Sequence, residues 1–380
     1  MFKNSSILIF ILFLLASCVN NQQADSAQQN KTLATFPVEQ ATGFTLSAIE
    51  QGYQISVTNP WQEAQGVEYR YLLTDKNILP KDVAFDEVIK TPAKRIVCLS
   101  TTHVAFIDRL GEANRIVGVS GADYVSSELV QKRIAEKLVK DVGYEQALNY
   151  ELVVSLKPDV VLAYGVGAEM AGYLQKLKDL KIPVIFIGDY LEENPLGKAE
   201  WIKVFGLLLD KYALADSIYS EVQTEYLGLK NMLPKDIVKP NVFINLPWKD
   251  IWYFTGSQGY LASLIDDAGG NYLLRHLEGN RSYPFSIENS LEYAAKADIW
   301  INPNMANSVA DIIAEVPILK GFSLVSDSTI FNNNNRVSPK GGNDFFESGT
   351  VNPHLILKDL IKIFHPNQLH HDLVYYKPLR

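Results

Sequence analysis

The stretch of sequence that decides the fold runs from Leu196 to Leu229 and reads LGKAEWIKVFGLLLDKYALADSIYSEVQTEYLGL. Its apolar residues recur at every third or fourth position, as on one face of a helix, at Trp201, Val204, Phe205, Leu208, Tyr212, Ile218, Val222 and Tyr226. No proline interrupts it, and Gly206 is its only weak point away from the ends. At about 1.5 Å per residue such a helix is roughly 50 Å long, longer than a helix that covers a sheet needs to be. We therefore predict one rigid helix, residues 195–232, that joins two halves of the chain.

The sequence before this helix alternates short apolar runs with helical patterns. Strands are predicted at Arg95–Ser100, Ile116–Ser120, Asp159–Tyr164 and Pro183–Gly188, and a helix at Thr102–Leu110. Continuous apolar strands that alternate with helices are typical of a parallel sheet covered on both faces. Residues 91–194 are therefore predicted to form an N-terminal α/β lobe.

The sequence after the helix repeats this rhythm. Strands are predicted at Asn241–Leu246, Asp298–Asn302 and Thr329–Asn332, and helices at Tyr260–Ala268, Ser286–Lys296, Ser308–Glu315 and His354–Phe364. The predicted fold class is therefore α/β, with two Rossmann-like lobes joined by one long rigid α-helix and the second lobe spanning residues 236–380. Ligands of open α/β sheets bind at the carboxyl ends of the strands, so the cleft between the lobes is the expected site.

A small antiparallel β unit is predicted ahead of the first lobe. Phe44–Ile49, Tyr53–Val57 and Val67–Leu73 alternate apolar and polar residues, and Asn59-Pro60 breaks the pattern between the second and third runs. Residues 38–90 are therefore predicted to form a β extension packed on the N-terminal lobe. The pattern itself carries no functional information.

The first residues read as an export signal. Lys3 is followed by an apolar run, Ile7–Leu15, that is too short to span a bilayer, and the run ends in Leu15-Ala16-Ser17-Cys18. Two small residues before a cysteine are the pattern of a bacterial lipobox, so residues 1–17 are predicted to be a signal peptide and Cys18 the lipidated residue. Residues 18–37 are predicted to be a flexible tether, since most of them are polar or small.

Composition narrows the possible partners. The 380 residues carry a formal net charge of −8, which argues against a nucleic-acid partner. The chain has two cysteines. With Cys18 assigned to the lipid, Cys98 in its apolar run is predicted to be a buried core residue, and no intramolecular disulfide is expected.

The motifs of the two lobes resemble those of the periplasmic binding proteins that serve iron-siderophore, haem and cobalamin import. The similar stretches are Pro92–Ser100, Arg109–Gly111, Arg115–Ser120, Asn149–Leu152, Leu156–Val161, Ser286–Glu288 and Ala297–Ile301. Their order around a single connecting helix is more specific than any one of them. The resemblance covers Pro92 to Phe364 and leaves out the β extension.

The resemblance implies a substrate-binding lipoprotein of an ABC importer. Such a protein captures an iron chelate or a corrinoid between its lobes and delivers it to a permease driven by an ATPase. We accordingly expect a monomer on the periplasmic face of a bacterial membrane, attached only by its lipid anchor and without a resident cofactor or metal. A haem receptor of the same type is the first alternative, and a membrane-tethered enzyme the second.

Two glutamates are the candidate permease contacts. The resemblance implies one surface carboxylate on each lobe that pairs with arginines of the permease, and the matching positions are Glu151 and Glu288. Separated exposed charges orient an encounter without demanding high affinity. A second interpretation is that each carboxylate stabilises the start of its own helix through the helix dipole. Ser286 is placed to cap the helix that contains Glu288.

The candidate ligand-binding residues lie on loops that follow predicted strands. They are Thr101, Thr102, Tyr124 and Tyr164 in the first lobe, with His103 and Tyr190 nearby, and Trp248, Trp252, Tyr253, Arg281, Tyr283 and Arg336 in the second, with Asn304 nearby. Aromatic side chains suit a large planar or macrocyclic ligand. Arginines at the rim suit carboxylates of haem or an anionic siderophore.

Two other kinds of site fit the sequence less well. A metal-ion receptor would use several histidines, but four of the six histidines lie between His354 and His371. His103 could be an axial haem ligand, although a buried helix-start residue is the simpler interpretation. Asp344 and Glu347 could form a catalytic acid–base pair in the glycine-punctuated stretch 341–349. No nucleophile elbow, phosphate-binding loop or zinc-hydrolase motif accompanies them.

Overall fold

The computed structural model describes residues 32–76, 85–144, 147–165, 170–326 and 329–380. The predicted signal peptide, the lipidation site Cys18 and most of the predicted tether lie outside these residues. None of the helices in the described ranges is long and apolar enough to cross a membrane.

The β extension is a five-stranded sheet in sequential order, β1-β2-β3-β4-β5. Its strands are β1 (Thr32–Phe36), β2 (Phe44–Ile49), β3 (Gly52–Thr58), β4 (Glu68–Thr74) and β5 (Glu87–Lys90). Strands β2, β3 and β4 pair antiparallel, as predicted, and β1 pairs antiparallel to β2, whereas β5 pairs parallel to β4. Strand β1 corrects the tether prediction, because residues 32–36 of that range pair with β2.

The N-terminal lobe is built on a parallel sheet of order β10-β9-β6-β7-β8. Its strands are β6 (Ile96–Cys98), β7 (Ile116–Val119), β8 (Lys140–Asp141), β9 (Val160–Ala163) and β10 (Val184–Phe186). Its helices are α1 (Thr101–Arg109), η1 (Ala113–Arg115), η2 (Ala122–Tyr124), α2 (Glu128–Ala135), α3 (Tyr150–Leu156), α4 (Met170–Asp179) and η4 (Asp189–Leu191). Four of these strands lie in the predicted segments, and Cys98 is a fully buried free thiol.

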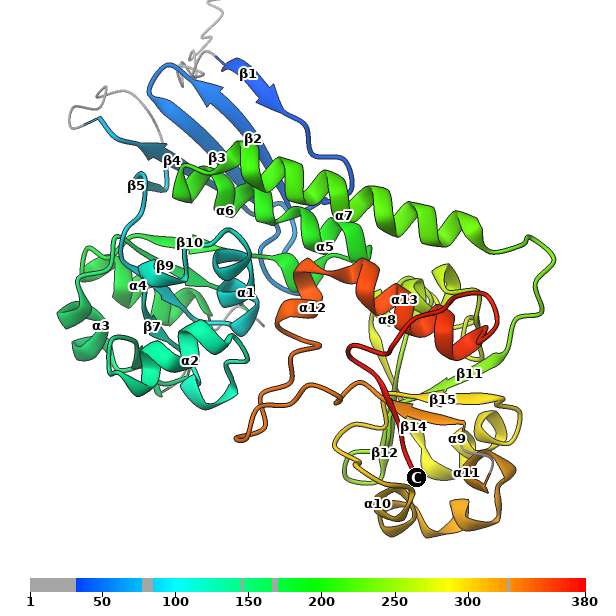
Figure 1. Cartoon of the computed structure of the whole chain (residues 1–380). Coiled ribbons are helices and arrows are strands. Elements are labelled where there is room, and N and C mark those ends of the chain that lie inside the picture. Colours follow the sequence, from blue (N-terminus) through cyan, green and yellow to red (C-terminus); the bar gives the residue numbers. More distant parts are fainter. Residues whose placement is uncertain (1–31, 77–84, 145–146, 166–169, 327–328) are drawn as a thin grey trace, which may run out of the picture.

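The connecting region contains one long helix, but that helix is shorter than predicted. The residues form α5 (Pro195–Glu200), α6 (Ile202–Leu209) and α7 (Tyr212–Met232), and only α7 runs from one lobe to the other (Figure 1). Asp210 adopts a left-handed conformation with φ 59°, which ends α6 and turns the chain. A Cβ on Gly206 would lie 2.6 Å from that of Ala215, so the glycine permits the close contact of α6 with α7. With 21 residues, α7 is about 30 Å long.

The C-terminal lobe has a sheet of order β13-β11-β15-β16-β17, in which only β17 is antiparallel. Its strands are β11 (Asn241–Ile244), β13 (Asn271–Tyr272), β15 (Ile299–Ile301), β16 (Ile330–Asn332) and β17 (Lys377–Pro378), and β12 (Ile251–Thr255) and β14 (Ser282–Ser286) form a separate antiparallel ribbon. Its helices are α8 (Tyr260–Asp267), α9 (Ile287–Ala294), α10 (Val309–Glu315), η5 (Pro317–Gly321), α11 (Ser323–Ser326), α12 (Ser348–Val351) and α13 (Pro353–Phe364). The predicted strands and helices of this lobe are present, but the ribbon was not predicted.

Two hydrophobic cores confirm the two-lobe architecture. One core joins the β extension, the N-terminal lobe and α6. The other joins the C-terminal lobe, α13 and the second half of α7. The β extension is therefore part of the N-terminal body rather than a separate domain. Its strands lie beside α6 and α7 on the side of the molecule away from α3 (Figure 1).

Two buried carboxylates fasten the chain segment 39–43 to the connecting region. The Glu200 carboxylate accepts hydrogen bonds from the backbone N–H groups of residues 39–41 and from the Lys203 ammonium group. The Glu192 carboxylate accepts the N–H and hydroxyl groups of Thr42, the N–H group of Gly43 and the indole N–H of Trp201. Four or more donors for each carboxylate offset the cost of burying it.

A second connection crosses between the lobes. We call residues 336–347, between β16 and α12, the bridging segment (Figure 1). Lys340 forms an ion pair with Asp123 of the N-terminal lobe at 2.5 Å. A Cβ on Gly342 would lie 2.2 Å from the backbone oxygen of Tyr124, so this approach requires a glycine. The bridging segment therefore forms one side of the space between the lobes.

Candidate ligand-binding cleft

A cavity of about 650 Å³ lies between the two lobes. Thr101 of α1, Tyr124 of η2 and Tyr190 of η4 come from the N-terminal lobe, and the bridging segment closes another side. Glu192 directly follows η4, and the other lining residues come from α5, α8, α12 and loops of the C-terminal lobe; they include Lys198, Tyr260, Leu261, Asn245, Asn302, Asn304, Met305, Asn333 and Thr350. The cavity lies where the topology predicted it, at the carboxyl ends of β6, β11, β15 and β16.

Two further cavities adjoin the main one. A cavity of about 610 Å³ shares Tyr190, Glu192, Tyr260 and Leu261 with it and is bounded by Gln62 and Glu63 of the β extension. A cavity of about 310 Å³ on the C-terminal lobe shares Asn304 and Met305. The cleft therefore has room for a ligand larger than the central cavity alone.

Four predicted ligand residues line these cavities. Thr101 and Tyr124 line the central one. Trp248, whose side chain is 61 % exposed, lines the 310 Å³ cavity, and Arg281 lines the 610 Å³ cavity. Arg281 lies over the ring of Tyr283, 4.5 Å from its centroid. Tyr283 itself lines none of the three cavities.

The prediction for Trp252 is wrong. Its side chain is fully buried, stacks on Phe254 and donates its indole N–H to the oxygen of Ile244 at 3.0 Å. Trp252 and Tyr253 lie in β12, where successive side chains point to opposite faces. The burial alternates accordingly, and Tyr253 also lies outside the three cavities.

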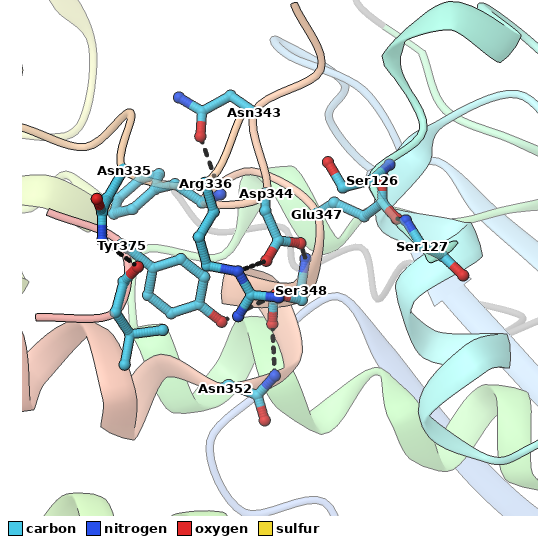
Figure 2. Close-up of polar contacts among 12 residues, drawn as sticks. Ser126, Ser127, Asn335, Arg336, Asn343, Asp344, Glu347, Ser348, Asn352 and Tyr375 are labelled. Carbon is cyan, nitrogen blue, oxygen red and sulfur yellow. Dashed lines mark hydrogen bonds and ion pairs between the residues drawn. The ribbon is translucent and has the colours of Figure 1, made fainter. Parts of the chain in front are cut away.

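Thr102, Tyr164 and Arg336 do not line these cavities either. The Thr102 hydroxyl lies 3.4 Å from the Asp189 carboxylate. Tyr164 packs edge-on against the rings of His103 and Tyr190. The guanidinium of Arg336 pairs with the carboxylate of Asp344 at 3.0 Å, so its charge is already matched inside the bridging segment (Figure 2).

The residues that the sequence analysis missed are mainly asparagines. Asn245 follows β11, Asn302 follows β15 and Asn333 follows β16, so three neighbouring parallel strands each end in an asparagine that lines the cavity. Asn245, Asn302 and Asn304 have φ values of 61°, 57° and 45°. Asparagine is one of the few residues that tolerates this left-handed region. The signal that could have found them is their position directly after apolar strands.

One carboxylate and one ammonium group line the central cavity, and both have partners. The carboxylate of Glu192 is bonded to the segment 39–43 and to Trp201. The ammonium of Lys198 lies 3.8 Å from the carboxylate of Asp189. Burial raises the pKa of Asp189, and the charge of Lys198 opposes this effect. Among the described residues, the wall of the central cavity therefore offers no cation without a counter-charge.

Glu151 and Glu288 occupy equivalent places on the two lobes. Each is exposed and is the second residue of its helix, α3 or α9. Asn149 caps α3 and Ser286 caps α9, as expected for Ser286. Hydrogen bonds from its own backbone N–H and from Ser286 lower the pKa of Glu288. Each cap accepts one N–H group of its helix, and both carboxylates are exposed on the surface.

The alternative chemistries find little support in the geometry. His103 is fully buried, and burial lowers its pKa to about 3. Asp344 is paired with Arg336, and Glu347 accepts two backbone N–H groups across the cleft (Figure 2). Both carboxylates of the proposed acid–base pair are therefore engaged in structural contacts. The described part of the chain contains no cluster of three or more His, Cys, Asp or Glu side chains placed to hold a metal ion.

Comparisons with known proteins extend this description. A family model described as periplasmic binding protein matches residues 96–327. An uncharacterized lipoprotein of Methanocaldococcus jannaschii is 22% identical, and the alignment covers 94% of this chain and 91% of that lipoprotein. An uncharacterized ABC transporter substrate-binding lipoprotein of Bacillus subtilis is 28% identical over 48% of this chain and 55% of its own. Among solved structures, a periplasmic heme binding protein from Pseudomonas aeruginosa has a TM-score of 0.58 at 17% identity, covering 76% of this chain and 98% of its own.

Proposed function

Since this chain belongs to the periplasmic binding protein family, we propose that it is the substrate-binding lipoprotein of an ABC importer. The observation that carries the proposal is the 650 Å³ cavity, whose walls come from both lobes. Contacts of the bridging segment connect the two lobes beside this cavity. A binding protein needs such a space, and its polar lining fixes the orientation of a ligand. The B. subtilis relative, named as an ABC transporter substrate-binding lipoprotein, supports the same assignment.

The proposed cargo is a metal chelate such as an iron-siderophore, or a corrinoid. Haem is the alternative, because one structural neighbour is named as a heme binding protein. The proposed anchor is a lipid on Cys18, on the periplasmic face of the membrane. A tether keeps a monomeric receptor close to its permease and thereby raises the effective concentration for docking.

Native mass spectrometry of the protein purified from its own host tests this proposal. We expect a non-covalent small-molecule adduct, a metal chelate or tetrapyrrole-like macrocycle, that is released unchanged in mass when the protein is denatured. An adduct that is chemically converted during incubation would show an enzyme. Purification without any adduct, followed by failure to bind iron chelates, corrinoids and haemin, would contradict the proposed function.

The docking role of Glu151 and Glu288 gives a separate prediction. The double variant Glu151→Arg, Glu288→Arg should abolish uptake by whole cells and leave the ligand dissociation constant within about twofold of the wild type, because neither residue lines the cavity. Uptake of radiolabelled ligand and isothermal titration calorimetry are the two measurements. The control is Glu136→Arg, Glu292→Arg, which reverses one exposed glutamate on each lobe. Normal uptake by the first variant, or loss of ligand affinity, would contradict the docking role.

A further inference from the structure

We propose that the contact between the bridging segment and residues 122–127 of the N-terminal lobe is a gate at one side of the cleft. The carboxyl group of Glu347 operates this gate: the protonated group keeps the gate closed, and ionisation of the group favours opening. The gate is a property of the chain alone. Its effect on the entry and release of a ligand rests on the proposed function.

The gate separates two cavities. On its inner side it borders the central cavity, which Tyr124 lines from the N-terminal lobe and Gly341, Gly342 and Phe346 line from the bridging segment. On its outer side it borders a cavity of about 260 Å³, where Asp123 and residues of α2 face Ser338 and Lys340. Parting the gate would therefore join the two cavities and add an opening to the cleft.

Three polar contacts hold the gate closed, and only one of them is buried. The Lys340 ammonium pairs with the Asp123 carboxylate at 2.5 Å, and the Ser338 hydroxyl donates to the backbone oxygen of Asp123 at 3.4 Å. The side chains of Lys340 and Asp123 are 66% and 58% exposed, so water screens their ion pair and the pair contributes little. The third contact, made by Glu347, is the one that decides whether the gate stays closed.

Glu347 binds the start of a helix that belongs to the other lobe. Its side chain is 2% exposed, and its two carboxyl oxygens accept the N–H groups of Ser126 and Ser127 at 2.6 and 2.7 Å (Figure 2). Ser127 is the N-cap of α2. The first N–H groups of a helix have no acceptor within the helix itself, so the carboxyl group of the bridging segment supplies one from across the cleft.

The charged groups that face Glu347 do not favour its ionised form. Asp344 of the bridging segment and Asp108 of α1 are both negative and raise the pKa of Glu347. Burial and the nearby Glu347 raise the pKa of the Cys98 thiol in β6, which is therefore neutral. Only the two backbone N–H groups act in the opposite direction. Glu347 is thus a buried carboxyl group whose ionisation is costly while the gate is closed.

The sign of the pH dependence follows from this difference between the two states. The pKa of Glu347 is about 8 in the closed gate, whereas a carboxyl group released into water returns to its ordinary pKa of 4.5. The closed gate therefore binds the proton more tightly than the open one. The proton stabilises the closed gate fully below pH 4.5, and this stabilisation is lost as the pH rises to about 8.

Hydrogen exchange of the Ser126 and Ser127 amides, followed by NMR, measures the opening without any ligand. These amides exchange when they part from Glu347. After correction for the intrinsic exchange rate, we expect their protection in the wild type to fall roughly a hundredfold from pH 5 to pH 8. In Glu347→Gln, which cannot ionise, protection should be lower at pH 5 and should change by less than about threefold over the same range.

The amide of Val161 distinguishes gate opening from unfolding of the whole chain. It lies in β9 and donates to the oxygen of Pro183 in the sheet of the N-terminal lobe. At pH 8 we expect Ser126 and Ser127 to be at least about tenfold less protected than Val161. Equal protection of all three amides at every pH overturns the gate. Parallel pH profiles of the Ser126 and Ser127 amides in the wild type and Glu347→Gln overturn the role of Glu347.

The variant Gly342→Ala tests the gate by a route that changes no charge. The added Cβ would lie 2.2 Å from the backbone oxygen of Tyr124, so the bridging segment must move away from the N-terminal lobe. At pH 5 we expect the protection of Ser126 and Ser127 to fall at least about tenfold, and by more than that of Val161.

The matched control is Gly321→Ala, because a Cβ at Gly321 meets no atom within 4 Å. This variant should leave the protection of all three amides within about twofold of the wild type. Unchanged protection of Ser126 and Ser127 in Gly342→Ala overturns the gate. None of these outcomes bears on the proposed function, because no ligand enters the measurement.

Discussion

Replacing Glu200 by alanine should lower the free energy of unfolding by about 3–5 kcal/mol. The Glu200 carboxylate is fully buried and accepts the N–H groups of Glu39, Gln40 and Ala41 at 2.7–2.9 Å. It also pairs at 2.9 Å with the ammonium of Lys203, which is 1% exposed. Its removal leaves three backbone donors without an acceptor and leaves the buried Lys203 ammonium with only the oxygen of Pro37 at 3.0 Å and the carboxylate of Asp216 at 3.4 Å. Breaking a buried pair in this way costs more than the pair itself contributes.

Urea unfolding, followed by tryptophan fluorescence, measures this loss. Trp201 packs against Phe44 beside the fastened segment and reports on it directly. The matched control is Glu292→Ala, which removes an exposed glutamate that also pairs with a lysine three or four residues away, Lys296 at 2.7 Å. That variant should leave the unfolding midpoint unchanged. Equal midpoints for the Glu200 and Glu292 variants would show that the fastening contributes nothing to stability.

The sequence predicted the two lobes well because their strands are short, apolar and buried on both faces. β6, β9 and β11 are such runs, and their order alternates with helices. The break in the connecting helix was missed for a physical reason. Both α6 and α7 turn apolar faces toward the same core, so the apolar spacing continues through Asp210 and Lys211 although the chain reverses there. Periodicity alone cannot distinguish a straight helix from a helical hairpin.

The sequence predicted the position of the cleft correctly, but it misidentified several of the side chains that line it. The sequence analysis favours aromatic residues near strand ends, but Trp252 lies in the unpredicted strand β12, on the face of that strand that packs into the core. Asn245 and Asn302 fall inside predicted strands and Asn333 directly follows one, so the local pattern indicates no lining role for these three residues. Their importance depends on strand order, since only the arrangement β11-β15-β16 brings their side chains to one wall. The strand order is a property of the folded sheet, and no local sequence pattern predicts it.

Glu347 connects the lobes through a buried carboxyl group. It belongs to the bridging segment, is 2% exposed and accepts the N–H groups of Ser126 and Ser127 at 2.6 and 2.7 Å (Figure 2). Burial raises the pKa of Glu347 to about 8. The two N–H groups oppose this shift, whereas the nearby charges of Asp344 and Asp108 add to it. In the unfolded chain the same group titrates near its ordinary value of 4.5.

The wild type should therefore lose stability between about pH 5 and pH 8, and Glu347→Gln should not. Below pH 4.5 the carboxyl group is protonated in both states, so it contributes no pH dependence. Above that value the unfolded chain releases the proton first, so the folded state loses stability progressively until the pH reaches about 8, and the loss is constant above that pH. Relative to the glutamine variant, the wild type should lose roughly 3 kcal/mol of unfolding free energy between pH 5 and pH 8. Urea titrations at both pH values measure the difference, with Glu292→Gln as the exposed control. Parallel pH profiles for the wild type and Glu347→Gln would show that the carboxyl group between the lobes is ionised throughout, held by Ser126 and Ser127 alone.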